Sequence, residues 1–189
     1  DKIYEKIIYD NEKHISPGAM EDIADRTITI NGFSKSYAMT GWRLGYVVAS
    51  PELIKVMIRV HQYTTVCATS FAQAGALTAL TSSQDSVDNM VTEFDKRRRV
   101  ILKTFKELPG AKLLTPRGAF YAFPDLSALN PDSETLASTL LEDVGIAVVP
   151  GKVFGKQGEG HIRISYACSL ENVERGMSAL KQYWQENIK

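Results

Sequence analysis

Residues 34–43, S-K-S-Y-A-M-T-G-W-R, place a lysine and an arginine where they could act on one small molecule. Lys35 comes just after an expected strand, and a lysine amine that is rigidly held and partly desolvated can be kept neutral enough to attack a carbonyl carbon. Arg43 follows a Thr-Gly turn, and its planar guanidinium suits a phosphate dianion. A phosphorylated aldehyde needs both groups. The pattern therefore points to pyridoxal 5′-phosphate.

Two strand signals flank this stretch. Residues 27–30, T-I-T-I, predict a strand that the Asn31-Gly32 pair ends, and residues 44–49 predict a second strand directly after Arg43. A lysine near a turn is usually a solvated surface charge. Its placement between two strands is what favours a reactive role here.

The string S-K-x-x-x-M-T-G-W-R-x-G, from Ser34 to Gly45, resembles the lysine region of class I/II aminotransferases, which are fold-type I pyridoxal-phosphate enzymes. The resemblance implies that Lys35 binds the cofactor as a Schiff base and moves a proton during catalysis. It also implies that Ser34 and Arg43 hold the cofactor phosphate. The resemblance extends over essentially the whole chain, but it corresponds only to the C-terminal half of the family's polypeptide.

Two further segments resemble parts of the same family's site. Asp1 and Tyr4 form a D-x-x-Y sequence upstream of Lys35. The resemblance implies that Asp1 pairs with the pyridine nitrogen and that Tyr4 donates to the 3-oxygen of the cofactor. Arg163, in the strand-like H-I-R-I-S segment, resembles the arginine that binds the substrate α-carboxylate, although alone it would be taken for an edge-strand charge.

The composition is that of an ordinary globular protein, with 189 residues, 44% hydrophobic side chains, and 22 basic and 22 acidic groups. A net charge of zero gives no attraction to nucleic acid or to an anionic membrane, and no apolar run approaches membrane-spanning length. We therefore expect neither partner. The one basic cluster, residues 96–99, lies in a helical pattern and is predicted to be a solvated helix face.

Cysteines and histidines give little support for other chemistry. Cys67 and Cys168 are too few for a disulfide scaffold, and we expect them to be buried free thiols in the cytoplasm. The three histidines lie far apart, so we expect no metal site. The chain also opens on Asp1 without a methionine, which suggests a C-terminal piece of a longer polypeptide.

The expected fold class is α/β in two domains. Residues 1–100 are predicted to be the C-terminal part of a large cofactor-binding domain with a mostly parallel sheet, and residues 101–189 a small α+β domain. Turn and cap signals predict helices from Ser50-Pro51 onward and at residues 71–80, 86–108 and 133–144, and a last helix capped by Ser169. Strands are expected at residues 146–149 and 161–166, with two short strands within residues 111–123.

The resemblance implies transfer of an amino group between an L-amino acid and a 2-oxo acid in a homodimer. Residues 61–70 resemble the loop that reaches the neighbouring subunit's site, and they contain no arginine for a side-chain carboxylate. Aromatic or other neutral amino acids are therefore favoured, followed by aspartate or an acylated diamino acid. The alternatives are a C–S β-lyase with the same cofactor and a non-catalytic interaction module. Residues 118–121 and 150–154 resemble small-domain segments that flank the substrate mouth, but their aromatic residues are expected to be core.

Overall fold

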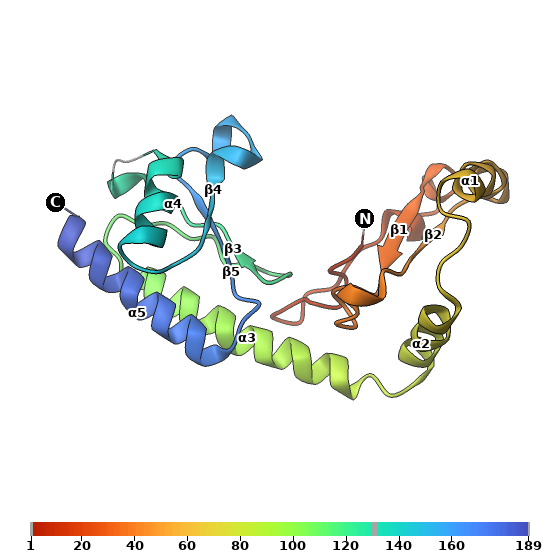
Figure 1. The fold of residues 1–189 in the computed structure, drawn as a ribbon, viewed down its shortest axis with the longest axis horizontal. Coiled ribbons are helices and arrows are strands. Elements are labelled where there is room, and N and C mark those ends of the chain that lie inside the picture. Colours follow the sequence, from red (N-terminus) through yellow and green to blue (C-terminus); the bar gives the residue numbers. More distant parts are fainter. Residues whose placement is uncertain (1, 130–131, 189) are drawn as a thin grey trace. The chain divides into compact units, whose positions relative to one another are not determined.

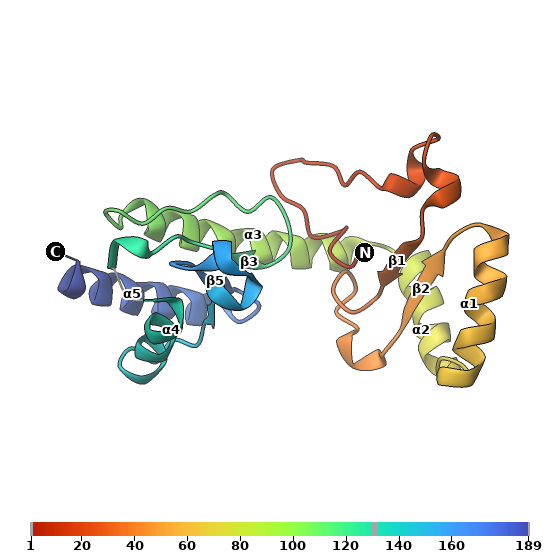
Figure 2. The same cartoon turned by 90° about the horizontal axis from the view of Figure 1, so that it is seen from above.

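The computed structural model describes residues 2–129 and 132–188. Contacts divide the chain into two compact units, Asp1–Val91 and Thr92–Lys189. Each unit has its own small antiparallel sheet and its own helices (Figures 1 and 2). The division into domains at residue 100 remains a prediction.

The first unit is built on two strands, β1 (Thr29–Gly32) and β2 (Gly45–Val48). They pair antiparallel with Gly32 opposite Gly45. Residues 33–44, called the lysine loop below, join the two strands without a crossover helix. A connection of this kind brings the chain straight back alongside β1, so the pairing has to be antiparallel.

Two helices follow β2 in the first unit. Helix α1 (Pro51–Thr64) begins as predicted, because the Ser50 hydroxyl accepts from the Leu53 amide and proline occupies the first turn. Helix α2 (Ser70–Thr81) turns its buried alanines toward the lysine loop. The small core between α2 and this loop consists of Phe33, Met39 and Ala76, with Tyr37, Leu44 and Ala79 packed against it.

The second unit holds the sheet β3-β5-β4, formed by β3 (Tyr121–Ala122), β4 (Val149–Pro150) and β5 (Ile162–Ser165). Both pairings are antiparallel. Side chains alternate along β5, so Ile162 and Ile164 are buried in the core while Arg163 lies on the opposite face.

Three helices complete the second unit. They are α3 (Asp85–Lys106), whose first turns belong to the first unit, α4 (Ser133–Glu142) and α5 (Leu170–Asn187). Helices α3 and α5 lie side by side (Figures 1 and 2). Lys181 of α5 pairs with Glu107 just after α3, and the Trp184 indole donates to the Pro109 carbonyl at 3.1 Å. These contacts fix the end of α5 against the end of α3.

The prediction of a mostly parallel sheet is wrong for the described residues, since their strands pair only antiparallel. The helices α1 and α2 follow β2 and do not connect two strands, so they form no parallel crossover. The strand expected at residues 27–30 is shifted, because β1 covers Thr29–Gly32 and its last two residues, Asn31 and Gly32, are paired with β2. The strand expected at residues 146–149 is shortened and shifted to β4 (Val149–Pro150). Within residues 111–123 only β3 forms, after the loop that contains Pro116 and Gly118.

The basic cluster is only partly a solvated face, as Arg98 shows. This residue is 2% exposed. It pairs with Asp95 at 2.7 Å and donates to the Pro116 carbonyl at 2.8 Å. A buried guanidinium needs such partners, and here one of them comes from a distant loop.

Two further observations concern solvent and membrane. Cys67 and Cys168 are free but exposed, so the prediction that they are buried is wrong. Among the described residues, no helix combines the length and the apolar composition that crossing a bilayer requires.

Replacing Ser169 with alanine should lower the free energy of unfolding by about 0.5–2 kcal/mol. The Ser169 hydroxyl accepts from the Asn172 amide at 3.2 Å and caps α5. Ser178→Ala, within the same helix, is the matched control and should change stability by only a few tenths of a kcal/mol, because alanine suits a helix interior. Urea unfolding followed by circular dichroism measures both. Equal losses would contradict the capping role.

Candidate active site

The lysine loop is closed by its own backbone. The Phe33 carbonyl accepts hydrogen bonds from the amides of Tyr37 and Met39, each at 3.2 Å. The Phe33 amide donates to the Leu44 carbonyl at 3.3 Å, which joins the two ends of the loop. These bonds pair backbone groups that would otherwise be left unsatisfied next to the apolar core, so the loop has one favoured conformation.

Side chains of the motif close the rest of the loop. The Thr40 hydroxyl donates to the Ser34 carbonyl at 2.8 Å, and Arg43 Nη1 donates to the Thr40 carbonyl at 2.8 Å. Arg43 has a φ of 54°, in the left-handed region that residues other than glycine seldom occupy. Its bond to Thr40 helps to hold this conformation. Ser34 and Arg43 are thus linked through a single threonine.

Lys35 lies in the turn at residues 34–37 and is half-buried. The next residue, Ser36, is 1% exposed and donates its hydroxyl to the Ile3 carbonyl at 3.3 Å. This bond ties the start of the chain to the lysine loop, including the half-buried Tyr4 of the D-x-x-Y segment. Asp1 lies outside the described residues, so its role stays a prediction.

Close contacts at two glycines, Gly75 and Gly45, explain two other positions of the motif, Trp42 and Gly45 itself. A Cβ atom on Gly75 of α2 would come within 2.6 Å of the Trp42 ring, so the indole packs directly on the helix backbone. A Cβ atom on Gly45 would lie 2.9 Å from the Asn31 carbonyl oxygen across the sheet. Trp42 and Gly45 therefore serve the packing of the loop, while other positions remain available for chemistry.

A depression of about 270 Å³ lies between the lysine loop and the start of the chain. The Ser34 hydroxyl makes no hydrogen bond with any described residue, and the exposed Arg43 side chain uses only Nη1. Free donors on a hydroxyl and a guanidinium at one hollow fit a phosphate group. Lys35 and Tyr4 do not line it. Its lining is Ile3, Ile30, Asn31, Gly32, Ser34, Arg43, Leu44 and Gly45.

A buried asparagine at this depression was missed by the sequence analysis. Asn31 Nδ2 donates to Glu5 at 2.6 Å and to the Tyr46 hydroxyl at 3.0 Å, and its Oδ1 accepts from the Gly32 amide at 2.8 Å. Partial burial acts to raise the pKa of Glu5, but hydrogen bonds from Lys2 and Asn31 outweigh it and leave that pKa below its usual value. Asn31 is thus a satisfied structural residue.

Arg163 belongs to the second unit and has no anionic partner among the residues that the structure describes. Its guanidinium carbon lies 4.6 Å from the centre of the Tyr121 ring and 5.0 Å from that of Phe154. Its Nε is buried without a hydrogen-bond partner, and its side chain makes no hydrogen bond or ion pair with any described residue. Unlike Arg98, it keeps its donors available.

The two aromatic rings are residues that the sequence analysis took for core. Phe154 is 52% exposed, and Tyr121 is half-buried. Tyr121 pairs with Ser165, two positions beyond Arg163, and therefore lies on the same face of the sheet as the arginine. The alternation of side chains along a strand could have indicated that Tyr121 lies beside Arg163. That inference requires the pairing of β3 with β5, which the sequence alone does not give.

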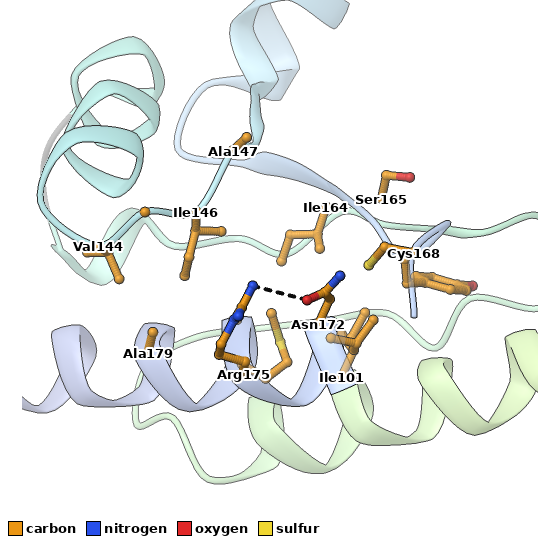
Figure 3. A pocket seen from close by; sticks show the side chains of 15 residues that line it. Ile101, Val144, Ile146, Ala147, Ile164, Ser165, Cys168, Asn172, Arg175 and Ala179 are labelled. Atoms are coloured by element: carbon orange, nitrogen blue, oxygen red, sulfur yellow. Dashed lines mark hydrogen bonds between the residues drawn. The ribbon is translucent and has the colours of Figure 1, made fainter. Parts of the chain in front are cut away.

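A second hollow, of about 320 Å³, lies between β5 and the helices α3 and α5 (Figure 3). Its lining is mostly apolar, and Arg175 donates to Asn172 at 3.0 Å at one side. Ile164, which lines it, lies on the face of β5 opposite Arg163. None of the predicted site residues lines this hollow, so it is separate from the candidate site.

The sequence matches the family model described as aminotransferase class I and II over residues 1–180. The chain belongs to this family. It is 46% identical to a probable aspartate aminotransferase of Methanocaldococcus jannaschii, over 98% of this chain and 49% of that protein. It is 37% identical to aromatic-amino-acid aminotransferase 2 of Thermococcus litoralis, over 98% of this chain and 48% of that protein.

A solved structure supports the same assignment for this aminotransferase-family chain. The aromatic aminotransferase from Pyrococcus horikoshii superimposes with a TM-score of 0.94 at 39% identity, over 98% of this chain and 50% of that one. The fold is therefore part of the α/β aminotransferase fold. The chain spans about half the length of the curated relatives it matches.

Replacing Thr40 with valine should speed amide hydrogen exchange of residues 34–43 by about two- to tenfold, because one hydrogen bond that closes the loop is lost. Thr81→Val is the matched control, since its hydroxyl donates only within helix α2. Hydrogen-exchange mass spectrometry measures both variants. Unchanged exchange in this segment would show that the Thr40 bond does not hold the loop closed.

Proposed function

We propose that the protein carrying this chain transfers an amino group between an L-amino acid and a 2-oxo acid, with pyridoxal 5′-phosphate as cofactor. The observation that supports this most strongly is a single closed loop that carries Lys35 together with the donors Ser34 and Arg43. When bound, the cofactor supplies an electron-poor ring that accepts electrons from the bond broken at the substrate Cα.

Each residue of the first unit has a distinct role in this proposal. The Lys35 amine binds the cofactor aldehyde and moves the proton at the substrate Cα. Ser34 and Arg43 bind the phosphate, supported by their free donors at one depression. Tyr4 donates to the 3-oxygen and Asp1 pairs with the ring nitrogen, roles that rest on the D-x-x-Y resemblance.

Arg163 holds the substrate α-carboxylate in the proposed reaction. A half-buried guanidinium without an anionic partner is costly by itself, and a carboxylate with two oxygens satisfies it bidentately. Its free donors among the described residues support this role. The same contact fixes the direction of the Cα–H bond relative to the cofactor ring, and this orientation determines which bond at Cα breaks.

The substrate we favour is an aromatic or another neutral amino acid, because residues 61–70 contain no arginine. Aspartate is the second candidate, supported by the name of the relative from Methanocaldococcus jannaschii. An acylated diamino acid comes next. A C–S β-lyase would use the same lysine and arginines, so the two reactions have to be distinguished by identifying their products.

We propose that the protein is a homodimer of the cytoplasm. Residues around the turn between α1 and α2 expose large side chains, with Tyr63 at 93%, Val66 at 78% and Phe71 at 70%. Such exposure supports contact with a second copy, which would bring the nearby threonine hydroxyls to the partner's phosphate. The free thiols of Cys67 and Cys168 support a reducing compartment.

Lys35→Ala in the intact protein should abolish covalent attachment of pyridoxal phosphate and lower amino-group transfer by several orders of magnitude, because the amine is lost. Borohydride reduction followed by peptide mass spectrometry measures the attachment. Lys55→Ala, on the exposed side of α1, is the matched control and should behave like the wild type.

The products separate the competing functions. With an amino acid and 2-oxoglutarate, an aminotransferase releases glutamate, whereas a C–S β-lyase acting on a sulfur amino acid releases pyruvate and ammonia. A non-catalytic module releases neither and retains its binding in Lys35→Ala. Glutamate formation that persists in Lys35→Ala would rule out the proposed role of this lysine.

A further inference from the structure

We propose that Tyr121 and Phe154 are positioning residues that clamp the Arg163 guanidinium between their rings and leave its N–H donors free for a carboxylate. The inference rests on the proposed function, because it takes Arg163 as the group that binds the substrate α-carboxylate. It adds two residues and a physical means of holding that arginine.

The first step concerns what holds Arg163 in place. Its guanidinium carbon lies 4.6 Å from one ring centre and 5.0 Å from the other, both within the range of a cation–π contact. Among the described residues, no acceptor binds its side chain. The two rings therefore supply the cation–π contacts that restrict the conformations of this long side chain.

The second step compares Arg163 with Arg98. Arg98 is fixed by the Asp95 carboxylate and the Pro116 carbonyl, which take up its Nε and Nη1 donors. A ring attracts a cation through its π face and takes up no N–H group. An arginine held by two rings thus keeps both its charge and its donor edge, which is what a bidentate carboxylate requires.

The third step asks whether the Phe154 ring is itself held. Phe154 ends the 3₁₀ turn η5 (Gly151–Phe154) and contacts the edge of Phe123, with ring centres 5.8 Å apart. The start of this turn is anchored, because the Gly151 amide donates to the His161 carbonyl at 2.8 Å. Its next amide, from Lys152, donates to the buried hydroxyl of Ser133 at 3.2 Å.

The Tyr121 ring is held from the other side. Its neighbour Phe120 stacks on Phe94 of α3, with ring centres 5.2 Å apart, and contacts Tyr121 at 4.9 Å. Arg98 donates to Pro116 in the loop that leads to β3. Both rings of the clamp therefore come from segments that hydrogen bonds and packing fix in position, so they can hold a flexible cation.

A clamp of this kind has a specific kinetic consequence. The amino acid and the 2-oxo acid share the α-carboxylate, so loss of the clamp should weaken the binding of both to a similar extent. Arg163 remains in a variant that lacks one ring and still orients the substrate once it is bound. Loss of the clamp therefore weakens binding equally before and during the reaction, which raises KM and leaves kcat nearly unchanged.

The test uses Tyr121→Leu and Phe154→Leu in the intact, cofactor-loaded protein. Each should raise KM for the amino acid and for the 2-oxo acid by about two- to 30-fold, with kcat within about twofold of the wild type. The dissociation constant of 3-phenylpropionate, measured by calorimetry, should rise by the same factor. Tyr121→Phe keeps the aromatic ring, so its KM values and its dissociation constant for 3-phenylpropionate should equal those of the wild type.

The outcomes distinguish this inference from the proposed function. Arg163→Lys removes the bidentate edge and should raise both KM values whether or not the clamp exists. If Arg163→Lys has no effect, the carboxylate role itself is wrong. If Arg163→Lys raises both KM values while both leucine variants match the wild type, the clamp alone is overturned. Should Tyr121→Leu fail to fold, as judged by circular dichroism, Phe154→Leu decides, since that side chain is half exposed.

Discussion

The Phe33 carbonyl holds the lysine loop closed, and the arrangement of the candidate site depends on it. By accepting from the amides of Tyr37 and Met39, it reverses the chain immediately after β1. Phe33 and Met39 then bury their side chains against Ala76 of α2, so packing and hydrogen bonding favour the same conformation. Within this frame, Lys35 lies half-buried in the turn that follows β1.

The three arginines discussed above illustrate how environment decides the use of one side chain. Arg98 is buried with a carboxylate and a carbonyl, and it joins α3 to a loop. Arg43 uses one nitrogen to fix its own left-handed backbone and keeps the others. Arg163 uses no nitrogen within the described residues. Availability for an external anion therefore increases from the first to the third.

Local signals in the sequence predicted local structure well. Ser50 and Ser169 cap the helices expected after them, because capping involves only a few neighbouring residues. The motif also located the loop that joins Ser34 and Arg43. Met39, Trp42 and Gly45 proved to be packing residues, as the contact of the Trp42 ring with Gly75 of α2 shows.

The failures concern contacts between distant residues. Strand direction depends on the partner strand, so the short segments could not reveal that their pairing is antiparallel. The burial of Arg98 depends on the Pro116 carbonyl, which belongs to another segment. Likewise, the position of Tyr121 on the same sheet face as Arg163 follows only from the pairing of Tyr121 with Ser165. In each case the missing information was the identity of a neighbour in space.

The contact between Gly151 and Gly158 limits how this part of the protein can diversify. A Cβ atom on either glycine would overlap the carbonyl of the other, so neither position accepts a side chain without moving the backbone. The residues between them are largely exposed, including Val153 beside the aromatic clamp. Substitutions at exposed positions between the two glycines, such as Val153, therefore leave this close backbone contact intact, whereas a side chain at either glycine would displace it.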